Sequence, residues 1–120
     1  MSKKILVIDD DPLFGAVIQT RLQTEGFLVH LCHTGEEGIR TFKNFGPDLV
    51  LLDIVLVGEN SGEIFDRIKA LNPLAKIVTA SAHGGLTTNE KEQERGAESF
   101  YDKAKNSVEL INIVKAALGE

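Results

Sequence analysis

Short apolar runs alternate with helical patterns along most of the chain. The runs are continuous, with few polar residues between the apolar ones, which is typical of strands buried on both faces of a parallel sheet. They cover residues 5–8, 27–32, 49–52, 77–80 and 99–101. Each of the five segments is therefore predicted to be a strand of one sheet.

The segments that follow the first, second, third and fifth runs carry apolar residues at helical spacing. Residues three and four positions apart share one face of a helix, so each set forms a stripe that can pack on the sheet. We expect these faces to be buried. They comprise Phe14, Val17, Ile18 and Leu22; Ile39 and Phe42; Ile64, Phe65, Ile68 and Leu71; and Leu110, Ile111, Val114 and Leu118.

Helix-boundary signals support the same helices. Short polar side chains cap helix starts, whereas glycine and proline mark their ends. The expected signals are a cap at Asp11 followed by Pro12, a capping box of Thr34 with Glu37, stops at Gly46-Pro47 and Asn72-Pro73, and a cap at Asn106 or Ser107.

The segment 84–95 departs from this pattern, because Leu86 is its one apolar residue. A helix there would have little to bury, so packing would hold it weakly. With this helix included, the order is (βα)₅, which favours an α/β fold with a doubly wound parallel sheet and helices on both faces. The flavodoxin-like strand order 2-1-3-4-5 is the natural candidate.

Length and charge restrict the classes of function that fit the chain. A chain of 120 residues predicts one domain over residues 1–120. The single cysteine, Cys32, and the lack of an apolar run of about 18–20 residues favour a cytoplasmic protein without a membrane span. A net charge of −5, with no basic stretch beyond Lys3-Lys4, argues against direct binding of nucleic acid. We therefore expect the partners to be proteins.

Five polar residues follow the predicted strands at or near the point where each apolar run ends. Because ligands of open parallel sheets bind at the carboxyl ends of the strands, these side chains are expected to converge on one crevice. They are Asp9 and Asp10 after the first run, Asp53 after the third, Ser81 after the fourth and Lys103 after the fifth.

The charges of these residues suggest phosphoryl chemistry. Three neighbouring carboxylates repel one another, and Mg²⁺, which prefers oxygen ligands, would remove that conflict. Lys103 offers a positive charge and Ser81 a hydroxyl donor to a phosphoryl group, while Asp53 can attack phosphorus as a nucleophile. His30, His33 and His83 have no metal-ligand spacing and are not placed as a general base, so they are interpreted as structural or exposed.

These residues resemble the receiver domains of two-component response regulators over nearly the whole chain. Residues 5–12 are similar to the opening strand and acidic pair of that family, and residues 47–53 to its phosphoacceptor strand. Gly96-Ala97, followed by Phe100 and Lys103, is similar to its fifth-strand motif. All three pieces in this order make the resemblance specific.

The resemblance implies that a histidine kinase or phosphotransfer protein phosphorylates Asp53. Asp9, Asp10, Asp53 and the backbone carbonyl of Val55 would then hold Mg²⁺. Ser81 and Phe100 would form the switch that reshapes the surface for a downstream protein or a fused output domain. Beyond accepting and losing its own phosphoryl group, such a domain is not an enzyme.

The sequence also departs from the family pattern. Val57 stands where a proline is usual, the loop 58–62 is one residue longer, and Ala104 replaces the proline that commonly follows the lysine after a cis bond. A cis bond before a residue other than proline costs roughly 2.5–4 kcal/mol. Val57, Ala104 and the polar segment 84–95 favour a competing function, that of a degenerate receiver that binds partners without phosphorylation.

An enzyme and a flavin binder fit the sequence less well. A phosphotransferase or phosphatase of the haloacid-dehalogenase kind would need a second acid two residues after Asp53, where Val55 stands. A flavin binder would need a first turn rich in glycine or hydroxyl groups, whereas the turn after the first run is acidic.

Overall fold

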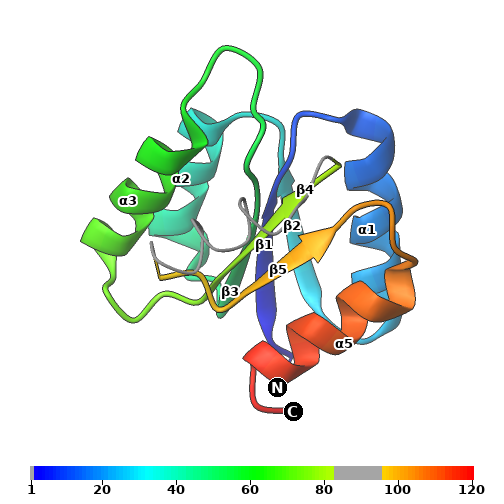
Figure 1. The fold of residues 1–120 in the computed structure, drawn as a ribbon. Coiled ribbons are helices and arrows are strands. Elements are labelled where there is room, and N and C mark those ends of the chain that lie inside the picture. The colour runs from blue at the N-terminus through cyan, green and yellow to red at the C-terminus, as the bar shows by residue number, and fades with distance from the viewer. Residues whose placement is uncertain (1, 83–95) are drawn as a thin grey trace.

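A parallel β-sheet forms the centre of the computed structural model, which describes residues 2–82 and 96–120 (Figure 1). Its strand order, β2-β1-β3-β4-β5, confirms the predicted doubly wound, flavodoxin-like fold. The order reverses between β1 and β3, so their carboxyl ends border the expected crevice. The strands are β1 (Lys4–Ile8), β2 (Leu28–Cys32), β3 (Leu49–Asp53), β4 (Ile77–Ser81) and β5 (Ser99–Asp102).

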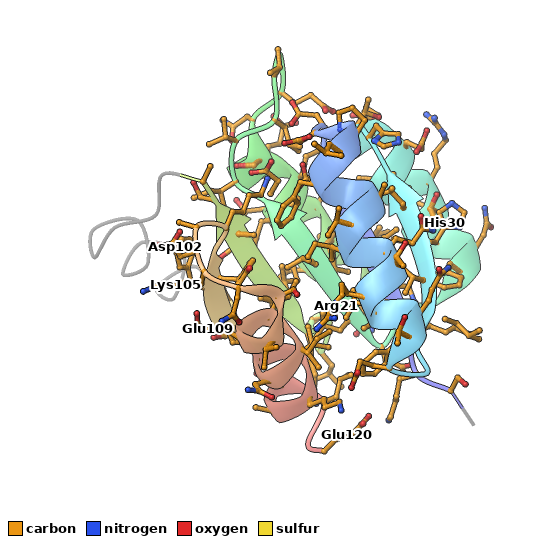
Figure 2. The ribbon with its side chains drawn as sticks, turned by 90° about the vertical axis from the view of Figure 1, so that its right-hand side faces the viewer. Arg21, His30, Asp102, Lys105, Glu109 and Glu120 are labelled. Atoms are coloured by element: carbon orange, nitrogen blue, oxygen red, sulfur yellow. The ribbon has the colours of Figure 1, made fainter. Side chains whose placement is uncertain are left out.

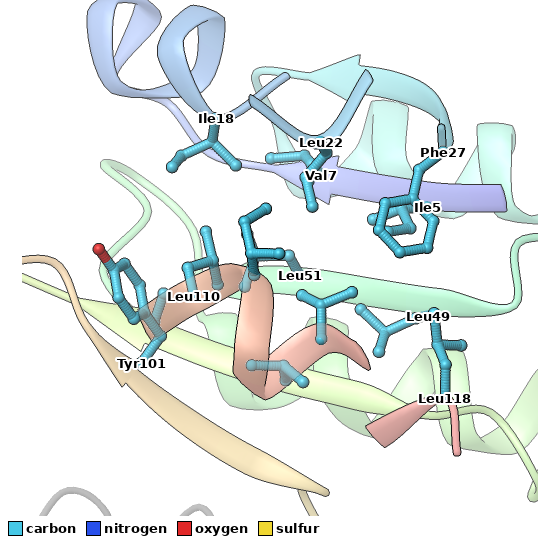
Figure 3. Packing of buried hydrophobic residues seen from close by; sticks show 14 residues of the cluster. Ile5, Val7, Ile18, Leu22, Phe27, Leu49, Leu51, Tyr101, Leu110 and Leu118 are labelled. Atoms are coloured by element: carbon cyan, nitrogen blue, oxygen red, sulfur yellow. The ribbon is translucent and has the colours of Figure 1, made fainter. Parts of the chain in front are cut away.

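Helices cover both faces of the sheet (Figure 1). Helices α1 (Pro12–Thr24) and α5 (Ser107–Ala117) lie on one face, and α2 (Gly35–Phe45) and α3 (Ser61–Leu71) on the other. Figure 2 views the first face with side chains drawn, and α1 and α5 lie next to each other there. Each face has its own apolar core, and Figure 3 shows the one beneath α1 and α5.

The helix starts follow the sequence signals. Asp11 accepts hydrogen bonds from the Leu13 and Phe14 amides, which confirms the cap of α1. Asn106 caps α5, so of the two candidates the asparagine is correct. The capping box of α2 is only half formed: Thr34 accepts from the Glu37 amide, but the Glu37 carboxylate accepts from His33 N at 3.3 Å.

Two residues predicted to be buried are exposed. Val17 is 49% exposed and Leu71 is 46% exposed. The buried stripe of α1 runs through Gly15, Ile18 and Leu22, and Val17 lies about 100° of helix rotation away from Ile18. Leu71 is the last residue of α3, three positions beyond Ile68, the last buried residue of that helix.

Two further differences concern element boundaries. The second strand begins at Leu28 instead of residue 27, and Phe27 is buried just before it. The weak helix predicted over residues 84–95 lies outside the described residues. None of the helices that the structure describes has the length and apolar character needed to cross a membrane.

Thr79 on β4 carries a buried hydroxyl. The residue is 0% exposed, and among the described residues no hydrogen-bond partner is found for its Oγ1. A buried polar group without a partner destabilises a fold, so Thr79→Val, which keeps the shape, is expected to raise the free energy of unfolding by about 1 kcal/mol. Urea unfolding measures this. Thr24→Val is the matched control, because the exposed Thr24 hydroxyl donates to Thr20 O at 2.9 Å and its removal should not stabilise the fold. Equal changes in the free energy of unfolding for the two variants would refute the prediction.

Candidate functional site

Strand register brings the three predicted acids together. Asp9 follows β1 directly and Asp53 is the last residue of β3, and these two strands are neighbours. One carboxylate oxygen each from Asp9, Asp10 and Asp53 lies within 4.8 Å of the others. Asp9 and Asp53 are only 2% and 5% exposed, whereas Asp10 is half-buried at the rim. The three acids therefore form one cluster at the carboxyl edge of the sheet.

Lys103 reaches this cluster from the end of β5. Its amide donates to Ser81 O at 3.0 Å, which fixes the turn after the strand. Its Nζ lies 2.8 Å from Asp9 Oδ2 and 3.0 Å from Asp53 Oδ2, and the side chain is 10% exposed. The lysine thus lies in the crevice where the sequence pattern placed it, and it bridges two of the acids there.

Backbone amides orient each carboxylate. Asp9 Oδ1 accepts from the Asp11 amide at 2.9 Å, and Asp53 Oδ1 from the Val55 amide at 2.9 Å. Asp10 Oδ2 accepts from the Val57 amide at 2.8 Å. This last bond joins the turn after β1 to the loop after β3, so the two loops that border the site are linked.

Burial, charge and hydrogen bonds together shift the pKa values of Asp53 and Lys103. Burial raises the pKa of Asp53, and the negative charge of Asp9 adds to the rise, against the lowering effect of hydrogen bonds from the Val55 amide and Lys103. Burial alone would lower the pKa of Lys103, but hydrogen bonds to Asp9 and Asp53 outweigh it and raise that pKa. Lys103 is therefore an ammonium ion at neutral pH.

The donor set fits a divalent cation. Three carboxylates face one ammonium group, so two negative charges lack a counter-charge when all three acids are ionised. Oxygen-only ligation with a high negative charge is what Mg²⁺ selects. Asp9, Asp10 and Asp53 are the residues that would hold it. The Val55 amide donates a hydrogen bond to Asp53. The role of the Val55 carbonyl as a metal ligand stays a prediction.

The two residues predicted to switch lie on neighbouring strands. Ser81 ends β4 and is buried, one residue beyond the Ala80 that pairs with Asp53. Phe100 on β5 is half-buried, and it is Tyr101, the next residue, that belongs to the core. Their roles in switching stay predictions. None of the described peptide bonds is cis, so the bond between Lys103 and Ala104 is trans.

Sequence reasoning missed three side chains around the site. The ring of Phe14 lies under the Lys103 ammonium, 4.4 Å from Nζ to the ring centroid. His33 Nδ1 lies 3.2 Å from the Asp9 carbonyl oxygen. Glu59, in the long loop after β3, accepts from the Gly35 and Glu36 amides at 2.8 and 3.1 Å and so caps α2. Each contact joins segments far apart in sequence, and spacing along the chain carries no signal for it.

Comparison with known families supports this arrangement. The sequence profile described as "Response regulator receiver domain" matches residues 5–115. The chain is 34% identical over 116 residues to the DNA-binding transcriptional regulator NtrC of a Bradyrhizobium species, covering 97% of this chain and 24% of that protein. It is 30% identical over 120 residues to the nitrogen assimilation regulatory protein NtrX of Azorhizobium caulinodans, covering 98% of this chain and 26% of that protein.

Solved structures show the same fold. A CheY-like response regulator receiver domain protein from Methanospirillum hungatei superposes with a TM-score of 0.91 at 26% identity, covering 99% of this chain and 95% of that one. NtrX from Brucella abortus superposes with a TM-score of 0.93 at 29% identity, covering 99% of this chain and 27% of that one. The chain thus spans about a quarter of the length of the NtrC and NtrX proteins that it matches.

Proposed function

The chain belongs to the response regulator receiver domain family, and from that premise we propose that it is a switch that accepts a phosphoryl group on Asp53 with Mg²⁺. The observation that carries the proposal is the contact of the buried Asp53 carboxylate with the Lys103 ammonium at 3.0 Å, within a cluster of three acids. A carboxylate held between positive charges is a suitable nucleophile for phosphorus.

In the proposed step, a carboxylate oxygen of Asp53 attacks phosphorus and forms a new O–P bond. The bond between phosphorus and the donor breaks, and the leaving imidazole nitrogen of a phosphohistidine, or the acetate oxygen of acetyl phosphate, keeps the electron pair. Lys103 exchanges its contact with Asp53 for a phosphoryl oxygen, and the Ser81 hydroxyl donates to another. When bound, Mg²⁺ neutralises phosphoryl charge.

Partners follow from this chemistry. The donor would be a histidine kinase or a phosphotransfer protein, and the phosphorylated domain would act on a downstream protein or on a fused output domain. The NtrC relative, called a DNA-binding transcriptional regulator, is about four times longer than the match, so that name applies to the whole of that relative. With a net charge of −5, this chain is proposed to contact proteins instead of DNA.

Incubation with acetyl phosphate tests the proposed function directly. Wild-type protein with Mg²⁺ should gain one labile phosphoryl group by intact mass, because Asp53, the two neighbouring acids and Lys103 meet at the site. Addition of a chelator beforehand should prevent the gain, since the acids alone repel the donor. A protein shown to be folded that gains no mass under these conditions would contradict the proposal.

That negative result would favour a receiver that binds partners without phosphorylation. Val57, Ala104 and the polar sequence of residues 84–95 are the departures that favour this second function, and the Val57 amide already donates to one oxygen of Asp10. The comparison of partner binding between wild type and Asp53→Asn then separates the two functions. A receiver that acts without phosphorylation should bind its partner equally well in both forms.

A further inference from the structure

The ammonium of Lys103 has an aromatic partner in addition to its two acids. The 4.4 Å from Nζ to the Phe14 ring centroid is well inside the range of a cation–π contact. The lysine side chain is 10% exposed, so the contact is largely shielded from water, where such contacts are strongest. The negative face of the ring and the two carboxylates therefore hold the same charge.

Phe14 is itself held in place. It is the third residue of α1, and its amide donates to the capping Asp11 Oδ1 at 3.2 Å. Its ring stacks on that of Tyr101, with centroids 6.5 Å apart and an angle of 26° between the planes. Tyr101 belongs to the core in Figure 3, and its hydroxyl donates to Lys105 O at 2.6 Å. The ring thus rests on a fixed part of β5 and of the loop after it.

We infer that Phe14 is a positioning residue for Lys103, an inference that rests on the proposed phosphoacceptor function. Lysine carries its charge on a flexible four-carbon stem with no preferred direction. In phosphoryl transfer the Asp53 carboxylate becomes an acyl phosphate, so that ionic partner of Lys103 changes. The ring of Phe14 does not change, and it keeps the ammonium at the site while the contact passes from Asp53 to a phosphoryl oxygen.

Phe14→Leu tests the role of the ring, since leucine keeps an apolar side chain without a π face. Uptake from acetyl phosphate should fall about tenfold, or about 1.4 kcal/mol of barrier. Phe14→Tyr keeps the ring and should stay within about twofold of wild type. Phe42→Leu, in the core on the other face of the sheet, is the control for loss of an aromatic core residue. All variants are compared at a temperature where circular dichroism shows them folded.

A second readout does not depend on phosphorylation. The ε-methylene protons of Lys103, identified by their loss in Lys103→Arg, should be shifted upfield by the ring in wild type and in Phe14→Tyr, and return to ordinary values in Phe14→Leu. If wild type takes up no phosphoryl group, the proposed function fails while this shift still tests the contact. An unchanged shift in Phe14→Leu, or uptake equal to that of Phe42→Leu, would overturn the inference.

Discussion

Asp53→Asn is expected to abolish phosphoryl uptake from acetyl phosphate, with a loss on the order of 10³-fold or more. The amide has nearly the same shape as the carboxylate but no negative oxygen with which to attack phosphorus. Lys103 keeps its contact with Asp9 at 2.8 Å, so the site should stay assembled around the neutral side chain. Intact mass over a time course with Mg²⁺ measures the loss.

Asp48→Asn is the matched control, because Asp48 is an exposed acid just before β3 whose Oδ2 accepts from the Lys4 amide at 2.7 Å. An amide oxygen can accept that same bond, so uptake by this variant should equal that of wild type. Phosphoryl uptake by Asp53→Asn at the wild-type rate would place the acceptor elsewhere and refute the proposed role of Asp53.

The same variant should be more stable than wild type in a metal-free buffer at pH 7. Burial raises the pKa of Asp53 above that of the unfolded chain. The folded state is therefore favoured while Asp53 is protonated, and this advantage disappears as the pH rises through the raised pKa. Above the raised pKa the buried carboxylate is ionised and destabilises the fold, and asparagine removes that charge.

Thermal unfolding with a chelator should accordingly give Asp53→Asn the higher Tm at pH 7, and the difference should shrink as the pH falls and wild-type Asp53 takes up its proton. Added Mg²⁺ should raise the Tm of wild type more than that of the variant, since binding to the folded state alone stabilises it. A lower Tm for Asp53→Asn in chelator would contradict this expectation. It would mean that the ion pair of the wild-type Asp53 carboxylate with Lys103 stabilises the fold by more than burial of the carboxylate destabilises it.

The parts of the site that depend on strand ends could be predicted from the sequence. In a parallel sheet every strand ends at the same edge, so the residues after each apolar run must gather there. This is why Asp9, Asp53 and Lys103 could be placed together without a structure. Helical spacing, in contrast, failed for Val17. It defines an apolar stripe but not how far around the helix the contact with the sheet extends.

Contacts made by loops could not be predicted in this way. The bond from the Val57 amide to Asp10 and the cap that Glu59 provides for α2 depend on loop conformations that no periodicity describes. Phe14 was correctly assigned to an inward-facing stripe, yet its contact with Lys103 depends on where the first turn of α1 lies relative to the residues at the end of β5. Sequence order therefore identified the acids and the lysine, whereas the surroundings that hold them required the structure.

Gly38→Ala is expected to lower the free energy of unfolding by about 2 kcal/mol. A Cβ atom at position 38 of α2 would lie 2.7 Å from Ile8 Cγ1, and Ile8 is 0% exposed with no space to move into. Overpacking typically costs about 1–3 kcal/mol, and a contact this short lies at the upper end of that range. The roughly 1 kcal/mol that alanine gains over glycine in a helix offsets part of this cost.

The clash should also reach the site, because Ile8 directly precedes Asp9, whose amide donates to Cys32 O at 3.0 Å. A shift of Ile8 displaces this carboxylate relative to Lys103, so phosphoryl uptake should be slower even where the variant is fully folded. Gly15→Ala is the matched control within a helix: the nearest atom to its Cβ is the flexible Leu31 Cδ1 at 3.0 Å. Urea unfolding should find this control as stable as wild type or slightly more so. If both alanine variants had the same stability, the close packing of α2 on β1 would not be what limits position 38.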